Sequence, residues 1–200
     1  MTRSFLLATA APLTLAACGS DTAETDAADN MALDNMAMDN ASMDSSGMTD
    51  AGTMPANGQE YATMAAASDM FEIESSRLAL EKTQNAGVRE LAQMIVTDHQ
   101  KSTADLKTAP GQADPPISVS PELNEEQQSN MTALRAASAP DFDRTYLGQQ
   151  IPAHEKALAM VQDYAQNGDV EALKQHASTV SGPVQRHLQR ARELQIQMGQ

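Results

Sequence analysis

Residues 154–176 read HEKALAMVQDYAQNGDVEALKQH, and this stretch decides the fold. Leu158, Val161 and Ala165 follow one another at intervals of three or four residues, which is the spacing of one face of an α-helix. Residues 167–169 (NGD) then end the helix, with Gly168 as a C-cap and Asp169 as the N-cap of the next helix. Two long helices joined by a tight turn are therefore predicted here.

The same spacing recurs on both sides of this stretch. The predicted long helices span residues 61–85, 88–108, 141–165 and 170–194, and a short helix spans 122–137. Residues 109–121 hold four prolines and one glycine, so they form a connection. Tight turns within each pair and a long link between the pairs predict an all-α fold, a ferritin-like four-helix bundle whose long crossover contains a short extra helix.

Composition excludes several classes of function. The chain has 200 residues, with 27 acidic against 13 basic side chains, a net charge of -14. Such a surface repels nucleic acid, so no nucleic-acid partner is expected. The one cysteine, Cys18, leaves no thiol chemistry within the bundle. No nucleophile elbow, phosphate-binding loop or zincin motif is present, so an enzyme is not predicted.

The first residues indicate export. Phe5 to Ala17 form an apolar run that is too short for a membrane span, which needs about 20 residues, so residues 1–17 are predicted to be a signal peptide. The run ends in LAAC at 15–18, which resembles the lipobox of bacterial lipoproteins. That resemblance implies lipidation of Cys18 and a membrane anchor, and Gly19 after it favours the periplasmic side of the outer membrane. The alternative is an ordinary cleaved signal with a coincidental cysteine.

Residues 18–60 are predicted to be a disordered tether after the lipidated cysteine. This stretch has no lasting apolar period, and residues 19–60 carry nine acidic groups and no basic one. Six methionines are interleaved with the aspartates: Met31, Met36, Met38, Met43, Met48 and Met54. Thioethers suit Cu(I), so this run is a candidate copper site, although a low-complexity spacer or a sink for oxidants would have the same composition.

Residues 61–200 are predicted to form the bundle, and one polar layer interrupts its apolar faces. Each long helix places one ionisable residue near its middle on the face that carries its apolar residues: Glu74, His99, His154 and His187. In an antiparallel bundle these residues share one level. Three imidazoles and a carboxylate could hold a single transition-metal ion, copper or else zinc, iron or nickel. A hydrogen-bonded layer that only fixes the helix register is the alternative. Asp98 and Asp143, at the edges of these faces, could orient a histidine.

Several short motifs resemble a bacterial ferritin-like family. They are residues 71–74 (FEIE), 91–99 (LAQMIVTDH), 141–147 (DFDRTYL), 154–157 (HEKA) and 187–188 (HL). The family is the domain of unknown function catalogued as 4142, and the resemblance covers residues 61–197. It implies a ferritin-like bundle in the cell envelope with no settled activity. Val96 and Val184 stand where di-iron proteins carry the glutamates of their Glu-x-x-His motifs, which makes di-iron oxidase chemistry the weakest interpretation.

These observations predict an envelope lipoprotein whose bundle binds a transition metal for sequestration or stress protection. Copper is favoured, partly by analogy with a related histidine- and methionine-rich family of envelope proteins. The alternative is a non-catalytic structural or protein-interaction module with an unidentified protein partner.

Overall fold

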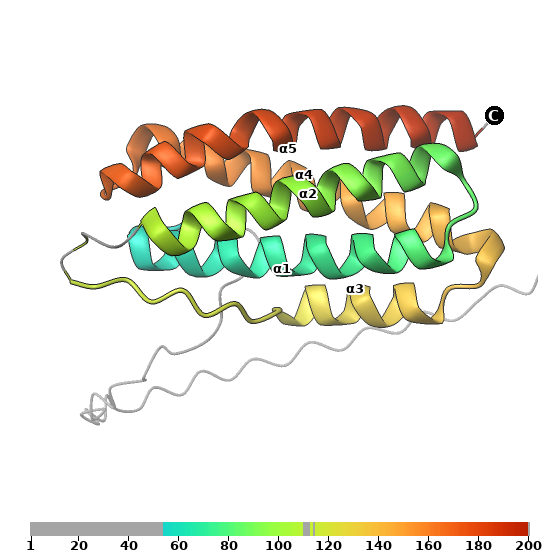
Figure 1. Cartoon of the computed structure of the whole chain (residues 1–200), viewed down its shortest axis with the longest axis horizontal. Helices are drawn as coiled ribbons and strands as arrows, with labels where there is room; N and C mark the ends of the chain where they lie inside the picture. Colours follow the sequence, from blue (N-terminus) through green and yellow to red (C-terminus); the bar gives the residue numbers. More distant parts are fainter. Residues whose placement is uncertain (1–53, 110–112, 114, 200) are drawn as a thin grey trace, which may run out of the picture. The chain divides into compact units, whose positions relative to one another are not determined.

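The computed structural model describes residues 54–109, 113 and 115–199. Within these residues the chain forms five α-helices and no strand (Figure 1). They are α1 (Gly58–Lys82), α2 (Ala86–Thr108), α3 (Glu125–Ala136), α4 (Ala139–Asn167) and α5 (Glu171–Met198). The predictions for the signal peptide, for Cys18 and for the tether up to residue 53 lie outside the described residues.

The four long helices pair in sequence order and then pack pair on pair. α1 and α2 form one antiparallel pair and α4 and α5 form the other, with α2 against α5 and α1 against α4 (Figure 1). The short helix α3 lies in the crossover and packs on α1 and α4. The predicted all-α bundle with a long crossover and a short extra helix is therefore confirmed, while kinship with ferritins stays a prediction. None of the described helices has an apolar stretch that could span a membrane.

Asparagine caps fix where three helices begin. The side chain of Asn57 accepts a hydrogen bond from the backbone N–H of Glu60 at the start of α1. Asn85 does the same for the first turn of α2, and Asn124 forms a reciprocal capping box with Gln127 in α3. Each cap satisfies backbone donors that the first helical turn leaves free.

The turn between α4 and α5 corrects one detail of the sequence prediction. Gly168 is the C-cap, as expected, but its φ of -61° is ordinary. Glycine is needed there for space, because a Cβ at this position would lie 2.6 Å from Cε1 of Tyr164. Asp169 does not cap α5, whose N-cap is Val170. The carboxylate of Asp169 instead accepts a hydrogen bond from the Tyr164 hydroxyl at 2.7 Å.

The core consists of two apolar clusters. One contains Leu91, Ile95 and Phe142, and the other contains Leu106 and Val161. On α2 and α4 the chain passes from one cluster to the other through a buried histidine. The polar layer therefore lies between the two clusters.

Candidate metal centre

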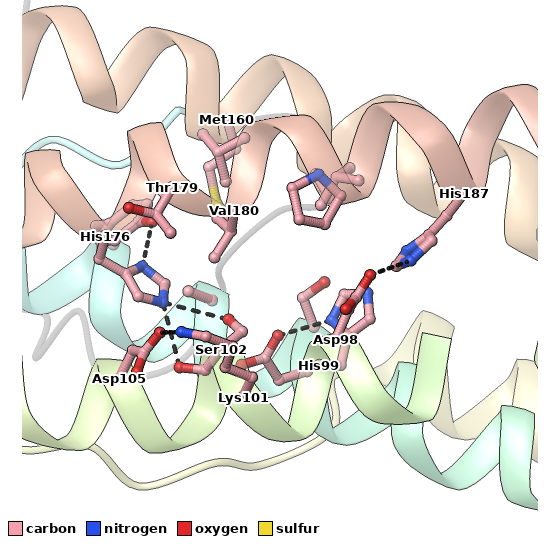
Figure 2. Close-up of a pocket in the computed structure, with 18 residues that line it drawn as sticks. Asp98, His99, Lys101, Ser102, Asp105, Met160, His176, Thr179, Val180 and His187 are labelled. Atoms are coloured by element: carbon pink, nitrogen blue, oxygen red, sulfur yellow. Dashed lines mark hydrogen bonds and ion pairs between the residues drawn. The ribbon is translucent and has the colours of Figure 1, made fainter. Parts of the chain in front are cut away.

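Three helices each place one histidine in this layer. His99 comes from α2, His154 from α4 and His187 from α5, and their residues are 5%, 2% and 0% exposed. One ring nitrogen from each lies within 4.8 Å of the others. Figure 2 shows His99 and His187 close together at one end of a pocket. The convergence predicted from the helical spacing is thus confirmed for these three residues.

Each histidine is held from outside by a hydrogen-bond acceptor. The Nδ1 of His99 lies 2.8 Å from Oδ1 of Asp69, on α1. The Nε2 of His187 lies 3.0 Å from Oδ2 of Asp98, and the Nδ1 of His154 lies 2.9 Å from the carbonyl oxygen of Gln150. Carboxylates and carbonyls only accept hydrogen bonds, so in each neutral imidazole the outer nitrogen carries the hydrogen.

The inner nitrogens of the neutral rings therefore carry lone pairs. Nε2 of His154 lies 3.3 Å from Nδ1 of His187. With both outer nitrogens protonated, neither of these inner atoms has a hydrogen to give the other. Nε2 of His99 is buried and has no hydrogen-bond partner within the described part of the chain. When His99 is neutral as well, three lone pairs converge without a hydrogen donor, an arrangement that a bound cation satisfies.

Burial keeps two of the three rings neutral near pH 7. Burial, followed by the neighbouring His99 and His187, lowers the pKa of His154 well below its usual value. Burial and His99 lower the pKa of His187 to about 4, against the opposing effect of Asp98. Burial alone would lower the pKa of His99 as well, but the hydrogen bond and charge of Asp69, with Glu72 and Asp98, raise it instead. Neutral imidazole is the form that binds metals.

Glu72 adds a third carboxylate to the site. Its Oε1 lies 3.6 Å from Nδ1 of His154, and its Oε2 is buried with no hydrogen-bond partner among the described residues. Burial raises the pKa of Glu72 to about 7, against the lowering effects of His99 and Gln150. Asp69, Glu72 and Asp98 thus stand one behind each histidine. Their charges would offset the charge of a divalent ion in this water-poor interior.

Glu74 does not join the layer, which corrects the sequence prediction. Its side chain is 37% exposed and lies 3.9 Å from Nη2 of Arg135, on α3. The physical reason is that α1 is packed on two sides. A step of two residues rotates a side chain by about 200° around the helix, so Glu74 points away when Glu72 points to the centre. The sequence prediction took the face of α1 that carries Phe71 and Leu78 as the inner one. This was wrong, because the inner face of α1 consists mainly of small and polar residues.

The sequence interpretation missed Asp69 and Glu72. The pattern that could have identified them is the series of small residues on their face of α1, which includes the buried residues Ala62, Ala65 and Ala79. Asp98 supports a histidine, as expected, whereas Asp143 makes no hydrogen bond or ion pair to a histidine in the described structure.

A fourth histidine lies apart from the centre. His176 is buried, and its Nδ1 accepts from the Tyr61 hydroxyl at 2.9 Å, while its Nε2 lies 3.3 Å from the carbonyl oxygen of Ser102. Both ring nitrogens of His176 have hydrogen-bond partners, so this histidine has a packing role. Of the six tether methionines, the structure describes Met54, which is 45% exposed.

The fold is shared with solved metal-bound proteins. CopM in its Cu(I)-bound form matches with a TM-score of 0.58 and 19% identity, over 69% of this chain and 94% of that chain. The Cu(II)-bound form matches with a TM-score of 0.60 and 18% identity, over 70% of this chain and 96% of that chain. The Ag-bound form matches with a TM-score of 0.56 and 20% identity, over 68% of this chain and 93% of that chain. At these identities the likeness shows the helical fold.

The sequence itself matches a family over most of its length. No curated protein sequence matches the chain. The family described as "Domain of unknown function (DUF4142)" matches residues 43–194, a region that contains all three histidines and the three carboxylates behind them. The match begins earlier than the bundle expected from the sequence, inside the segment predicted to be a tether. The chain belongs to the DUF4142 family.

Proposed function

We propose that the bundle binds one transition-metal ion through His99, His154 and His187, for sequestration or stress protection in the cell envelope. The observation that carries the proposal is the convergence of three buried imidazole nitrogens within 4.8 Å, which have no hydrogen donor among them when all three rings are neutral. Each outer nitrogen is fixed by an acceptor, an arrangement typical of metal-binding histidines. The role is binding, without catalysis.

Copper is the favoured ion. Three imidazoles suit Cu²⁺, Zn²⁺, Fe²⁺ or Ni²⁺, so the donor set does not choose between them. The structures of CopM hold Cu(I), Cu(II) or silver in the same fold, which adds weight to copper. The methionine run of residues 31–54 would add a Cu(I) site outside the bundle. We further propose that Cys18 anchors the chain to the periplasmic side of the outer membrane.

A structural role for the layer is the second candidate. The layer joins all four long helices, because Asp69 lies on α1, His99 on α2, His154 on α4 and His187 on α5. Such a layer would fix the helix register without any ion, and the bundle would then serve as a structural or interaction module.

Metal content separates these candidates. Residues 19–200 and 57–200 are exposed to a mixture of Cu²⁺, Zn²⁺, Fe²⁺ and Ni²⁺, dialysed and measured by mass spectrometry. We expect close to one ion in the shorter protein and additional Cu(I) capacity in the longer one under reducing conditions. Metal on the longer protein alone would move the function to the tether, and metal on neither would contradict the proposal.

Variants test the ligands directly. The double variant His99→Leu/His154→Leu should lose both the ion and the metal-dependent rise in melting temperature. His154→Leu serves as a second variant, because it leaves the bond between His99 and Asp69 intact. His176→Gln is the matched control, since it removes a buried histidine outside the centre, and it should keep the ion. A register layer would instead tolerate the leucines with no change in metal content.

A further inference from the structure

A cavity of about 120 Å³ lies beside His99 and His187, two of the three histidines. His99, His187 and Asp98 line one end, and Tyr61 and His176 line the other. Figure 2 shows His176 at one end and His99 with His187 at the other, with Ser102 between them. His154 is not among the lining residues, so it stands behind His99 and His187 as seen from the cavity.

The cavity has apolar walls and reaches solvent. Met160, Val180 and Val184 form part of its wall, while the lining residues Lys101 and Thr179 are exposed. Its volume is several times the share of one water molecule in the liquid, about 30 Å³. A small polar molecule or a triatomic anion fits this space, whereas a large chelator does not.

Four residues that line the cavity and carry side-chain oxygens already have hydrogen-bond or ion-pair partners. Asp69 accepts from His99 and Asp98 from His187. Asp105 is paired with Lys101, and the Ser102 hydroxyl lies 3.2 Å from Nε2 of His176. A four-coordinate ion held by three histidines needs one more ligand atom. On the side of the histidines that faces the cavity there is open space where that ligand could bind.

We propose that the ion held by the three histidines has a fourth, exchangeable coordination position that faces this cavity and takes a small donor from solvent, such as water, hydroxide or a small anion. The inference rests on the proposed function, since it requires an ion at the three histidines. An exchangeable position would also let the ion be loaded and released by ligand exchange through the cavity. An ion enclosed by four protein ligands would resist both loading and release.

Azide binding to the Cu²⁺-loaded protein tests the proposal. Azide on copper adds a charge-transfer absorption band, which we expect to grow to saturation in the wild-type protein. Val184→Phe fills the cavity one helical turn before His187 and should weaken azide binding at least about tenfold at unchanged copper content. Val180→Phe, at a partly exposed position, is the second variant in case Val184→Phe does not fold. Val119→Phe is the control, because Val119 packs against the same apolar cluster as Val180 without lining the cavity.

The outcomes distinguish this inference from the proposed function. Stoichiometric copper without an azide band, or equal azide affinity in folded Val184→Phe or Val180→Phe and in the wild type, would overturn the open position and leave metal binding intact. Absence of copper from the wild-type protein would overturn both. Benzimidazole in place of azide tests the size limit, because it is a larger donor that does not reduce Cu²⁺, and binding as tight as that of azide would overturn the restriction to small donors.

Discussion

Replacing Glu72 with glutamine is expected to stabilise the metal-free protein at pH 8 and to weaken its hold on a metal ion. Glu72 is 2% exposed, and burial raises its pKa from the usual 4.5 to about 7. Between these pH values the unfolded chain has released the proton that the folded protein still holds. Stability is therefore lost as the pH rises through this window, and the loss is complete above about pH 7.

The magnitude follows from the size of the shift. A change from 4.5 to about 7 corresponds to about 3 kcal/mol of destabilisation at pH 8, and to less than about 1 kcal/mol at pH 5. Glutamine has nearly the same shape and no charge, so Glu72→Gln should recover most of that difference at pH 8. The histidines are present in both proteins, so the comparison isolates Glu72. In the metal-loaded protein the lost negative charge should weaken binding roughly 10- to 100-fold.

Urea unfolding at pH 5 and pH 8 in the presence of a chelator measures the first effect, and competitive metal titration measures the second. Glu74→Gln is the matched control, since it makes the same change two residues along α1 at a side chain that is 37% exposed. It should alter stability by less than about 0.5 kcal/mol and leave metal affinity unchanged. A Glu72→Gln protein that is destabilised at both pH values would refute the reasoning, because Glu72 would then be held as a favourable ion pair with the histidines.

Three further predictions test the support of the site, the interior of α4 and the turn that follows it. Asp69→Asn removes the charge behind His99 and should weaken metal binding roughly 10- to 100-fold, whereas Asp105→Asn, which lines the same cavity but pairs with Lys101, should change it by less than about threefold in the same titration. Gly148→Ala should stabilise α4 by about 0.5–1 kcal/mol, because an added Cβ meets nothing within 4 Å. Gly168→Ala should destabilise the protein by about 1–3 kcal/mol in urea unfolding, because its Cβ would collide with the Tyr164 ring.

The sequence predicted the site where a helix buries one apolar stripe. In α2, α4 and α5 the large apolar residues lie on the face that points to the centre, with Ile95, Val161 and Leu188 as buried examples. A histidine in phase with such a stripe must point inward, because the helical period leaves it no other direction. His99, His154 and His187 could therefore be found from spacing alone.

The same reasoning failed on α1 because that helix contacts neighbours on two sides. Phe71 and Leu78 share a face of α1 with Glu74, which lies beside Arg135 of α3, and the inner face is built from residues such as Ala65 and Ser76. Small residues contribute little to a hydrophobic pattern, so the inner face of α1, which carries Asp69 and Glu72, is harder to recognise in the sequence than the face with Phe71 and Leu78. The contact with α3 arises from the crossover, and no local spacing within α1 reports it.

The chemistry of the centre depends on contacts between helices more than on the histidines themselves. His99 presents a lone pair inward because Asp69, 30 residues earlier in the sequence, accepts the hydrogen of its outer nitrogen. His187 does so because Asp98, 89 residues away, performs the same role. A slip of α1 along its neighbours would leave every histidine in the layer and still free the outer nitrogen of His99 from its acceptor. That ring could then turn its hydrogen inward, and one of the three lone pairs that favour a cation would be lost. Metal affinity is therefore a property of the assembled register, which is why the sequence predicts the ligands more readily than the strength with which they bind.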